Sequence, residues 1–204
     1  MGMKRIAVLA SGRGSNFQAL IDAIGAGTLP ARCAGLVTDN PQAYAITRAK
    51  KAGIPVTVVD YSGCAGKDEY EAALLEAMDR CNADLFVLAG YMRILGAGIV
   101  SHFKGRIINI HPALLPSFAG LHAQRQAIDY GVKVSGCTVH FVDEGMDTGP
   151  IIIQRPVPVC DGDDEDSLAG RILIEEHLAL PEAVKLFCEE RLMVCGRAVH
   201  ILPP

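Results

Sequence analysis

Two polar side chains interrupt the otherwise aliphatic segment Ile107-Ile108-Asn109-Ile110-His111-Pro112. In a strand, residues two apart project from the same face, so Asn109 and His111 point the same way with Cα atoms about 6.5 Å apart. Burying two polar groups together costs free energy unless they have partners, and ligands of open α/β sheets bind at the carboxyl ends of strands. The Asn-x-His-Pro combination therefore favours a functional site over the alternative, a structural histidine at a strand end.

A carboxylate that could serve this histidine lies in the downstream turn Asp143–Pro150. Asp147 could reach back toward His111, and so could the nearby His140. A carboxylate beside a histidine orients the ring and favours its protonated form, which gives an acid poised near neutral pH. The alternative is an aspartate that caps a Gly-Pro turn, and sequence spacing does not separate the two.

A glycine-rich turn, Ser11-Gly-Arg-Gly-Ser-Asn16, leads from a buried strand into a helix. Backbone N–H groups at such a helix start form an anion site, and small residues allow a phosphate to approach closely. Phe17 stands where the dinucleotide fingerprint has its third glycine, and the Gly-Lys-Ser/Thr of a P-loop is absent. The turn therefore fits one phosphate better than a dinucleotide or triphosphate. An ordinary strand-to-helix turn capped by Ser15 or Asn16 is an equal alternative.

A fourth segment, Gly90-Tyr91-Met92-Arg93-Ile94-Leu95, follows another buried strand. Its mixture of apolar side chains and accessible backbone is suited to line a slot for a flat ring. An ordinary contact with the core is the alternative for these residues.

Alternating strands and helices position these segments. The run Ile6–Ala10 is typical of a strand buried on both faces, and the residues after it have helical spacing, with Asn16 as the cap and Gly25 as the stop. Pro181 is expected to kink or divide the last helix, after a solvated acidic loop, Asp161–Asp166. The further predicted strands are 35–37, 55–59, 85–88, 106–111, 137–142 and 151–157, and the helices are 43–52, 67–80, 123–130 and 167–192.

This pattern predicts an α/β fold, a doubly wound, mostly parallel sheet. The sequence shows no internal repeat and no linker-like change in composition. We therefore expect a single domain over residues 1–204, with a core at about 4–192 and a C-terminal tail at 194–204.

The composition excludes several classes of protein. With 19 Lys and Arg against 23 Asp and Glu among 204 residues, the formal charge of −4 argues against binding of nucleic acid by phosphate neutralisation. No apolar run approaches the roughly 20 residues that span a bilayer, and the N-terminus has no cleavable signal pattern, so we expect a cytoplasmic protein. The seven cysteines are odd in number and lack zinc-ligand spacing, so neither disulfides nor a metal site is expected.

Taken together, these segments resemble the phosphoribosylglycinamide formyltransferases, folate-dependent enzymes of purine biosynthesis. The similarity covers residues 4 to about 192, and its most specific part is the Asn-x-His-Pro segment combined with Asp147-x-Gly-Pro150. The other matching stretches are 10–16, 88–95, 108–116, 120–122, 139–142 and 176–177.

The resemblance implies a Rossmann-like formyltransferase fold and two small-molecule substrates, 10-formyltetrahydrofolate as co-substrate and glycinamide ribonucleotide. It implies no metal, nucleic-acid or membrane partner, and either a monomer or a homodimer. By matching position, it assigns catalysis to Asn109, His111 and Asp147, and support to His122 and His140. It assigns the substrate's phosphate and ribose to Gly14, Ser15, Asn16 and Glu176, and the folate to Lys67, Met92, Arg93, Ile94, Leu95, Asp143, Glu144, Gly145 and Met146.

In the implied mechanism, the substrate's amine attacks the formyl carbon, and Asn109 and a protonated His111 donate hydrogen bonds to the developing oxyanion. Asp147 is expected to keep His111 cationic. The sequence departs from the family pattern at Ser117 and Ala119, where some members carry Lys and Pro, and in the tail Val194–Pro204.

The sequence leaves two alternative functions open. A formyltetrahydrofolate hydrolase or a methionyl-tRNA formyltransferase shares the catalytic trio, but each carries an additional domain for which we expect no space here. A nucleotide-binding module without catalysis is the alternative from a different class, because a fold alone does not prove an activity.

Overall fold

Strand β1 (Lys4–Leu9) forms from the aliphatic run near the N-terminus, and its side chains from Ile6 to Leu9 are fully buried. In the computed structural model, which describes residues 2–204, β1 pairs in parallel with β2 (Ala31–Thr38) and with β4 (Leu85–Leu88). A strand with both edges paired and both faces covered needs a continuous apolar run, which explains the sequence of β1.

The chain divides into two compact units, Met1–Ile108 and Asn109–Pro204. In the first unit β2 also pairs in parallel with β3 (Val56–Val58), which gives the strand order β3-β2-β1-β4. The elements between the strands are α1 (Ser15–Gly25), α2 (Tyr44–Lys51), the 3₁₀ helix η1 (Tyr61–Gly63), α3 (Lys67–Cys81) and α4 (Ala97–His102). The predicted α/β fold with parallel strands is confirmed. That residues 1–204 act as one domain stays a prediction.

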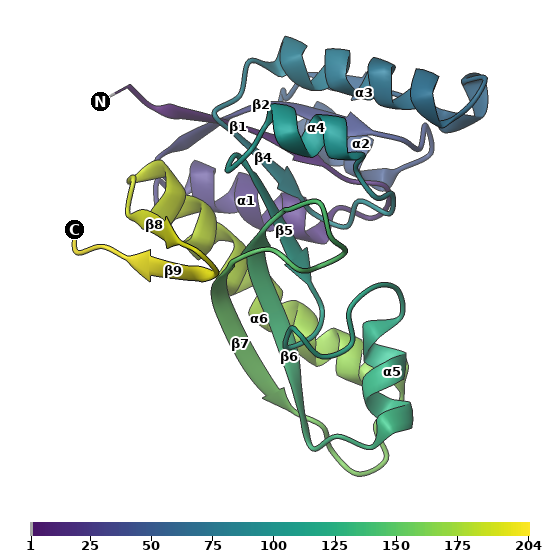
Figure 1. Ribbon diagram of the computed structural model, residues 1–204, viewed down its shortest axis with the longest axis vertical. Helices are drawn as coiled ribbons and strands as arrows, with labels where there is room; N and C mark the ends of the chain where they lie inside the picture. The colour runs from purple at the N-terminus through teal and green to yellow at the C-terminus, as the bar shows by residue number, and fades with distance from the viewer. Residues whose placement is uncertain (1) are drawn as a thin grey trace. The chain divides into compact units, whose positions relative to one another are not determined.

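Strand β5 (Ile107–His111) begins in the first unit and ends in the second. In the second unit β6 (Val134–Phe141) and β7 (Ile151–Pro158) form an antiparallel pair, against which α6 (Glu165–Cys188) packs (Figure 1). Helix α5 (Ala123–Tyr130) contacts α6.

Helix boundaries differ from the sequence prediction at α1 and α6. The prediction of Asn16 as the cap of α1 is wrong, because Gly14 occupies the N-cap in a left-handed conformation (φ 65°) and Asn16 lies inside the helix. Asp164 caps α6 instead of lying in a loop, since its carboxylate accepts the Ser167 N–H at 2.8 Å. The helix ends at Cys188 and continues through Pro181 without division, with buried Leu180 and Ala183 on either side.

The C-terminal tail is an element that sequence reasoning missed. It forms the hairpin of β8 (Leu192–Cys195) and β9 (Ala198–Ile201), and β9 pairs with β7 at Ala198 and Ile151. Between the two strands, the Arg197 guanidinium donates to the Thr148 carbonyl at 2.8 Å. The tail is therefore tied to the loop that carries Asp147.

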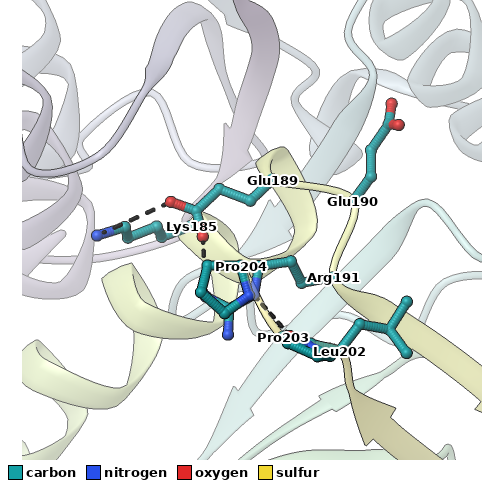
Figure 2. Close-up of a pocket in the computed structure, with 7 residues that line it drawn as sticks. All are labelled: Lys185, Glu189, Glu190, Arg191, Leu202, Pro203 and Pro204. Atoms are coloured by element: carbon teal, nitrogen blue, oxygen red, sulfur yellow. Dashed lines mark hydrogen bonds and ion pairs between the residues drawn. The ribbon is translucent and has the colours of Figure 1, made fainter.

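A pocket of about 470 Å³ lies where this tail meets the end of α6 (Figure 2). Within it, Glu189 forms ion pairs with Lys185 at 3.9 Å and Arg191 at 3.2 Å, and the Arg191 Nε donates to the Leu202 carbonyl. None of the residues predicted to do chemistry lines this pocket, so it is separate from the candidate site. The lining residues are Lys185, Glu189, Glu190, Arg191, Leu202, Pro203 and Pro204.

Thr138 in β6 fixes the segment that follows the catalytic candidate His111. Its hydroxyl is fully buried, donates to the Ala113 carbonyl at 2.7 Å, and accepts from the Leu115 N–H at 3.0 Å. The Gln154 side-chain amide donates to the same oxygen at 3.0 Å and to the Leu115 carbonyl at 2.9 Å. One hydroxyl thus satisfies three polar groups away from water.

We predict that Thr138→Val lowers the free energy of unfolding by about 2–4 kcal/mol, because valine keeps the shape but leaves buried polar groups unpaired. Chemical denaturation measures the change. Thr28→Val is the matched control, since the exposed Thr28 hydroxyl makes one bond, to the Ala23 carbonyl at 3.1 Å. Equal effects of the two substitutions would contradict the structural role of Thr138.

Candidate functional site

Asn109, His111 and Asp147 meet in the second unit. The Nδ1 atom of His111 lies 3.4 Å from Oδ2 of Asp147, and the Asn109 amide donates to Oδ1 of the same carboxylate, also at 3.4 Å. Asn109 and His111 sit on one face of β5, as their spacing predicts, and Asp147 comes from the loop after β6. His111 is only 5% exposed, so the trio lies in a largely desolvated environment.

His140 joins the trio from β6. Its Nδ1 atom lies 2.8 Å from the Phe141 carbonyl, which only accepts hydrogen bonds, so Nδ1 of the neutral ring carries the proton. The Nε2 atom then accepts from the Asn109 amide at 3.2 Å. Because the Asn109 Nδ2 faces two acceptors, His140 and Asp147, the orientation of its amide is fixed.

The backbone around Asp147 holds this carboxylate in place. Asp147 adopts a left-handed conformation (φ 54°), which non-glycine residues rarely adopt. Gly149 packs so closely that a Cβ there would lie 1.7 Å from the Phe141 carbonyl oxygen, so only glycine fits. On the other side, the Gly120 N–H donates to Asp147 Oδ2 at 2.8 Å. The loop is thus constrained at and on both sides of the carboxylate.

Asp147 is ionised at neutral pH. Burial acts to raise the pKa of this carboxyl, but the hydrogen bond from the Gly120 N–H and the nearby His111 hold the pKa below its ordinary value. The site therefore carries a fixed negative charge.

The pKa of His111 is shifted in the direction opposite to the one expected from the sequence. Burial lowers the pKa of His111, although the Phe118 carbonyl, 2.8 Å from Nε2, and the Asp147 carboxylate both favour the charged ring. The net shift is downward, so the expectation that Asp147 keeps His111 cationic in the resting protein is wrong. Desolvation of the ring outweighs its two acceptors.

In the first unit, the turn before α1 is shaped by α2. The Gly12 carbonyl accepts from the Ala45 N–H at 3.1 Å, and the Arg13 carbonyl accepts from the Arg48 Nε at 2.8 Å. In a trans peptide the C=O and N–H groups point in opposite directions, so the next N–H groups, of Arg13 and Gly14, turn away from α2. Such an arrangement of backbone N–H groups can bind an anion.

The Gly90–Leu95 loop also lies in the first unit and contacts the same turn. The Ser11 N–H donates to the Gly90 carbonyl at 3.0 Å, and the Met92 N–H donates to the Ser11 hydroxyl at 2.9 Å. Met92 is 62% exposed and Ile94 is 70% exposed, whereas Leu95 is buried. The loop thus presents two apolar side chains on its surface.

The other predicted site residues are more dispersed. Lys67 begins α3 and forms an exposed ion pair with Glu71 at 3.5 Å, and Glu176 is buried on α6.

Asp143 accepts from the Thr148 hydroxyl at 2.6 Å, while Met146 is exposed. Glu144 and Gly145 complete this exposed stretch of the loop, and Ser15 and Asn16 form the first turn of α1. His122, at the start of α5, is exposed and lies 3.9 Å from Glu165.

Two backbone groups of the site, the Phe118 carbonyl and the Gly120 N–H, were not singled out by sequence reasoning. Main-chain atoms carry no side-chain signature, and Gly120 appeared only as part of a matched stretch. The signal in the sequence is the glycine itself, because glycine readily adopts a positive φ such as the 84° found at Gly120.

Two further findings concern residues 2–204. No group of three or more His, Cys, Asp or Glu side chains is placed to hold a metal ion, and the seven cysteines are free thiols. No helix among these residues is long and apolar enough to cross a membrane.

Comparison with known proteins yields one family and several close relatives. A model of the formyl transferase family matches residues 4–184. The phosphoribosylglycinamide formyltransferase of Escherichia coli is 39% identical over 203 residues, which cover 98% of this chain and 96% of that protein. The trifunctional purine biosynthetic protein adenosine-3 of Drosophila melanogaster is 48% identical over 185 residues. That match covers 90% of this chain but only 14% of the longer protein.

A solved structure agrees with this assignment. The crystal structure of glycinamide ribonucleotide transformylase 1 from Symbiobacterium toebii superposes with a TM-score of 0.96 and is 48% identical in sequence. It covers 98% of this chain, which in turn covers 95% of that structure.

The lowered pKa of His111 predicts a pH dependence of stability. Below about pH 6.5 the unfolded chain binds a proton at this histidine, whereas the folded protein does so only at a lower pH, so acidification destabilises the fold. We expect His111→Asn to reduce the loss of unfolding free energy between pH 7.5 and 5.5, by at most about 1 kcal/mol.

Urea denaturation at the two pH values measures this difference. His102→Asn is the matched control, because the His102 side chain is 47% exposed in its pair with Asp79. A parent and a His111 variant with the same pH dependence would contradict the burial effect.

Proposed function

We propose that this chain, which belongs to the formyl transferase family, transfers the formyl group of 10-formyltetrahydrofolate to the amine of glycinamide ribonucleotide. The names of relatives that align over nearly their whole length support formyl transfer to this acceptor. In this chain, the observation that carries the proposal is the convergence of Asn109 and His111 on the Asp147 carboxylate. The product would enter purine biosynthesis.

The reaction is a group transfer between two nitrogen atoms. The amine of glycinamide ribonucleotide forms a bond to the formyl carbon, and the carbonyl oxygen gains negative charge in the tetrahedral intermediate. The bond from carbon to N10 then breaks, the carbonyl re-forms, and the proton lost by the amine is delivered to N10. No covalent intermediate with the protein is required, and holding both substrates together supplies the entropic part of the acceleration.

Asn109 and His111 are the donors that we assign to the developing oxyanion. The Asn109 amide is oriented by His140 and Asp147 before any substrate binds. Both of its N–H groups then have acceptors, so one of them exchanges its partner for the oxyanion during the reaction. The neutral His111 ring becomes a better proton acceptor as negative charge develops beside it. A donor aimed at an oxyanion contributes about 3–4 kcal/mol by the usual mutational measure.

Asp147 orients His111 and stabilises the imidazolium once it forms. Because its carboxyl stays ionised, Asp147 supplies the compensating charge at the point when His111 takes up a proton. In this role Asp147 assists the transfer of the amine proton toward N10, which we assign to a path through water.

The binding groups follow from the family assignment and from the loops described above. The N–H groups of the Gly14 turn would hold the substrate phosphate with Ser15 and Asn16, and Glu176 would contact the ribose. Met92, Ile94 and the Asp143–Met146 stretch would contact the folate, as would Lys67. A monomer or a homodimer stays the prediction for the oligomeric state.

Replacing Asp147 with asparagine tests the proposed chemistry. We predict that Asp147→Asn lowers kcat by at least about 100-fold, because the charge that compensates the imidazolium is lost. The KM for glycinamide ribonucleotide should stay within about threefold, since asparagine still accepts from the Gly120 N–H. Steady-state formyl transfer without ATP measures both values.

The control variant is Asp129→Asn, which removes a carboxylate from an exposed pair with Arg125. Turnover of Asp147→Asn at the parent rate would refute the assigned role. Release of formate by the parent protein in the absence of the amine substrate would instead indicate a hydrolase.

Gly14 provides a test of the phosphate site. We predict that Gly14→Ala raises the KM for glycinamide ribonucleotide at least about tenfold, because a Cβ would lie 2.8 Å from the Ala45 Cβ and displace the turn. Gly27→Ala is the matched control, since Gly27 has a similar φ of 71° and a Cβ added there would meet no atom within 4 Å. An unchanged KM in Gly14→Ala would place the phosphate elsewhere.

A further inference from the structure

The loop that follows β4 is held by side chains from several elements of the first unit. Ser11 bonds to the backbone of Gly90 and Met92, as described above. The Tyr91 hydroxyl is hydrogen-bonded to the hydroxyl of Tyr70 on α3, and Arg93 is bound through its guanidinium. All four residues from Gly90 to Arg93 therefore have a defined partner.

The Arg93 guanidinium is the most extensively bound of these groups. Its Nε donates to Oδ2 of Asp39 at 2.9 Å, and the Asp39 side chain is only 8% exposed. The guanidinium carbon lies 4.0 Å from the ring centre of Tyr61 and 5.3 Å from that of Tyr70. A planar guanidinium can donate in its plane and stack on aromatic faces at the same time, which a lysine cannot do.

The tyrosines pack against each other beside Arg93. The rings of Tyr61 and Tyr70 meet edge to face with centroids 5.2 Å apart, and Tyr70 is buried. Burial raises the pKa of both Tyr70 and Tyr91, so their phenols keep their protons and their mutual hydrogen bond at neutral pH. We call the five residues Asp39, Tyr61, Tyr70, Tyr91 and Arg93 the Arg93 clamp.

The Arg93 clamp determines which side chains of the Gly90–Leu95 loop face outward. Arg93 turns back onto Asp39 and Tyr61, while its neighbours Met92 and Ile94 are 62% and 70% exposed. The two most exposed side chains of the loop are therefore apolar, while the Arg93 side chain, drawn toward Asp39, is 37% exposed. An apolar surface on a fixed backbone suits the face of a flat heterocyclic ring better than a carboxylate does.

We propose that the Arg93 clamp positions the Met92–Ile94 backbone and side chains to receive the ring of the formyl donor, and that Asp39 and Arg93 are positioning residues. This inference rests on the proposed function for the identity of the donor. It assigns to Arg93 a positioning role, because its Nε donates to Asp39 and its guanidinium stacks on Tyr61.

Removing the charge of Asp39 tests the Arg93 clamp without changing any residue of the Gly90–Leu95 loop. We expect Asp39→Asn to raise the KM for 10-formyltetrahydrofolate by about fivefold, with the KM for glycinamide ribonucleotide and kcat changed by less than about twofold. Calorimetric titration with folic acid, which carries the ring but no formyl group, should show the same weakening. The double variant Asp39→Asn with Arg93→Lys should bind folic acid no more weakly than the weaker-binding single variant. Both substitutions break the same interaction, between Arg93 and Asp39, so their effects should not add.

Arg106→Lys is the control, because Arg106 also stacks on an aromatic ring, 5.2 Å from the centre of Phe103, but lies outside the clamp. An unchanged folic acid affinity in Asp39→Asn would overturn the proposal. A loss of affinity in Arg93→Lys with none in Asp39→Asn would mark Arg93 as a direct ligand and would also overturn the proposal. Equal losses for both substrates would mark a general structural defect and would do the same. A parent protein that binds folic acid but transfers no formyl group would refute the proposed function, and the binding comparison would still decide the clamp.

Discussion

The Asp147 carboxylate is the shared acceptor on which the geometry of the second unit's site depends. It receives the Gly120 N–H and the Asn109 amide, and it lies beside the ring of His111. It reaches this position only because the chain adopts a left-handed conformation at Asp147 and because Gly149 has no side chain to collide with the Phe141 carbonyl. A strained backbone held by surrounding contacts is a recurrent feature of active sites.

Burial sets the protonation states that this arrangement can use. Desolvation alone would neutralise both partners, but Asp147 receives enough hydrogen bonds to stay ionised, whereas His111 does not receive enough to stay charged. The resting site thus combines a fixed anion with a neutral imidazole that can accept a proton. Such a pair suits a reaction in which negative charge appears and then disappears on the substrate. In the first unit, the Arg93 clamp likewise uses a buried carboxylate to fix a loop.

Sequence reasoning predicted most of the parallel architecture, because β1 and β4 are continuous aliphatic runs, which are typical of strands buried on both faces. The alternation in β5 likewise placed Asn109 and His111 on one face. Its errors came from groups whose partners are distant in sequence or belong to the main chain. The protonation of His111 depends on burial, Asp39 becomes significant only once Arg93 folds back onto it, and the tail forms a hairpin only because β7 offers a partner at Ile151. None of these contacts has a local signature.

The most direct test is an NMR titration of the His111 ring nitrogens in the parent protein and in Asp147→Asn. We predict a His111 pKa below the ordinary histidine value in the parent and a still lower one in the variant, because the variant loses a carboxylate that partly offsets burial. An unchanged or higher His111 pKa in Asp147→Asn would contradict the claim that this carboxylate organises the site.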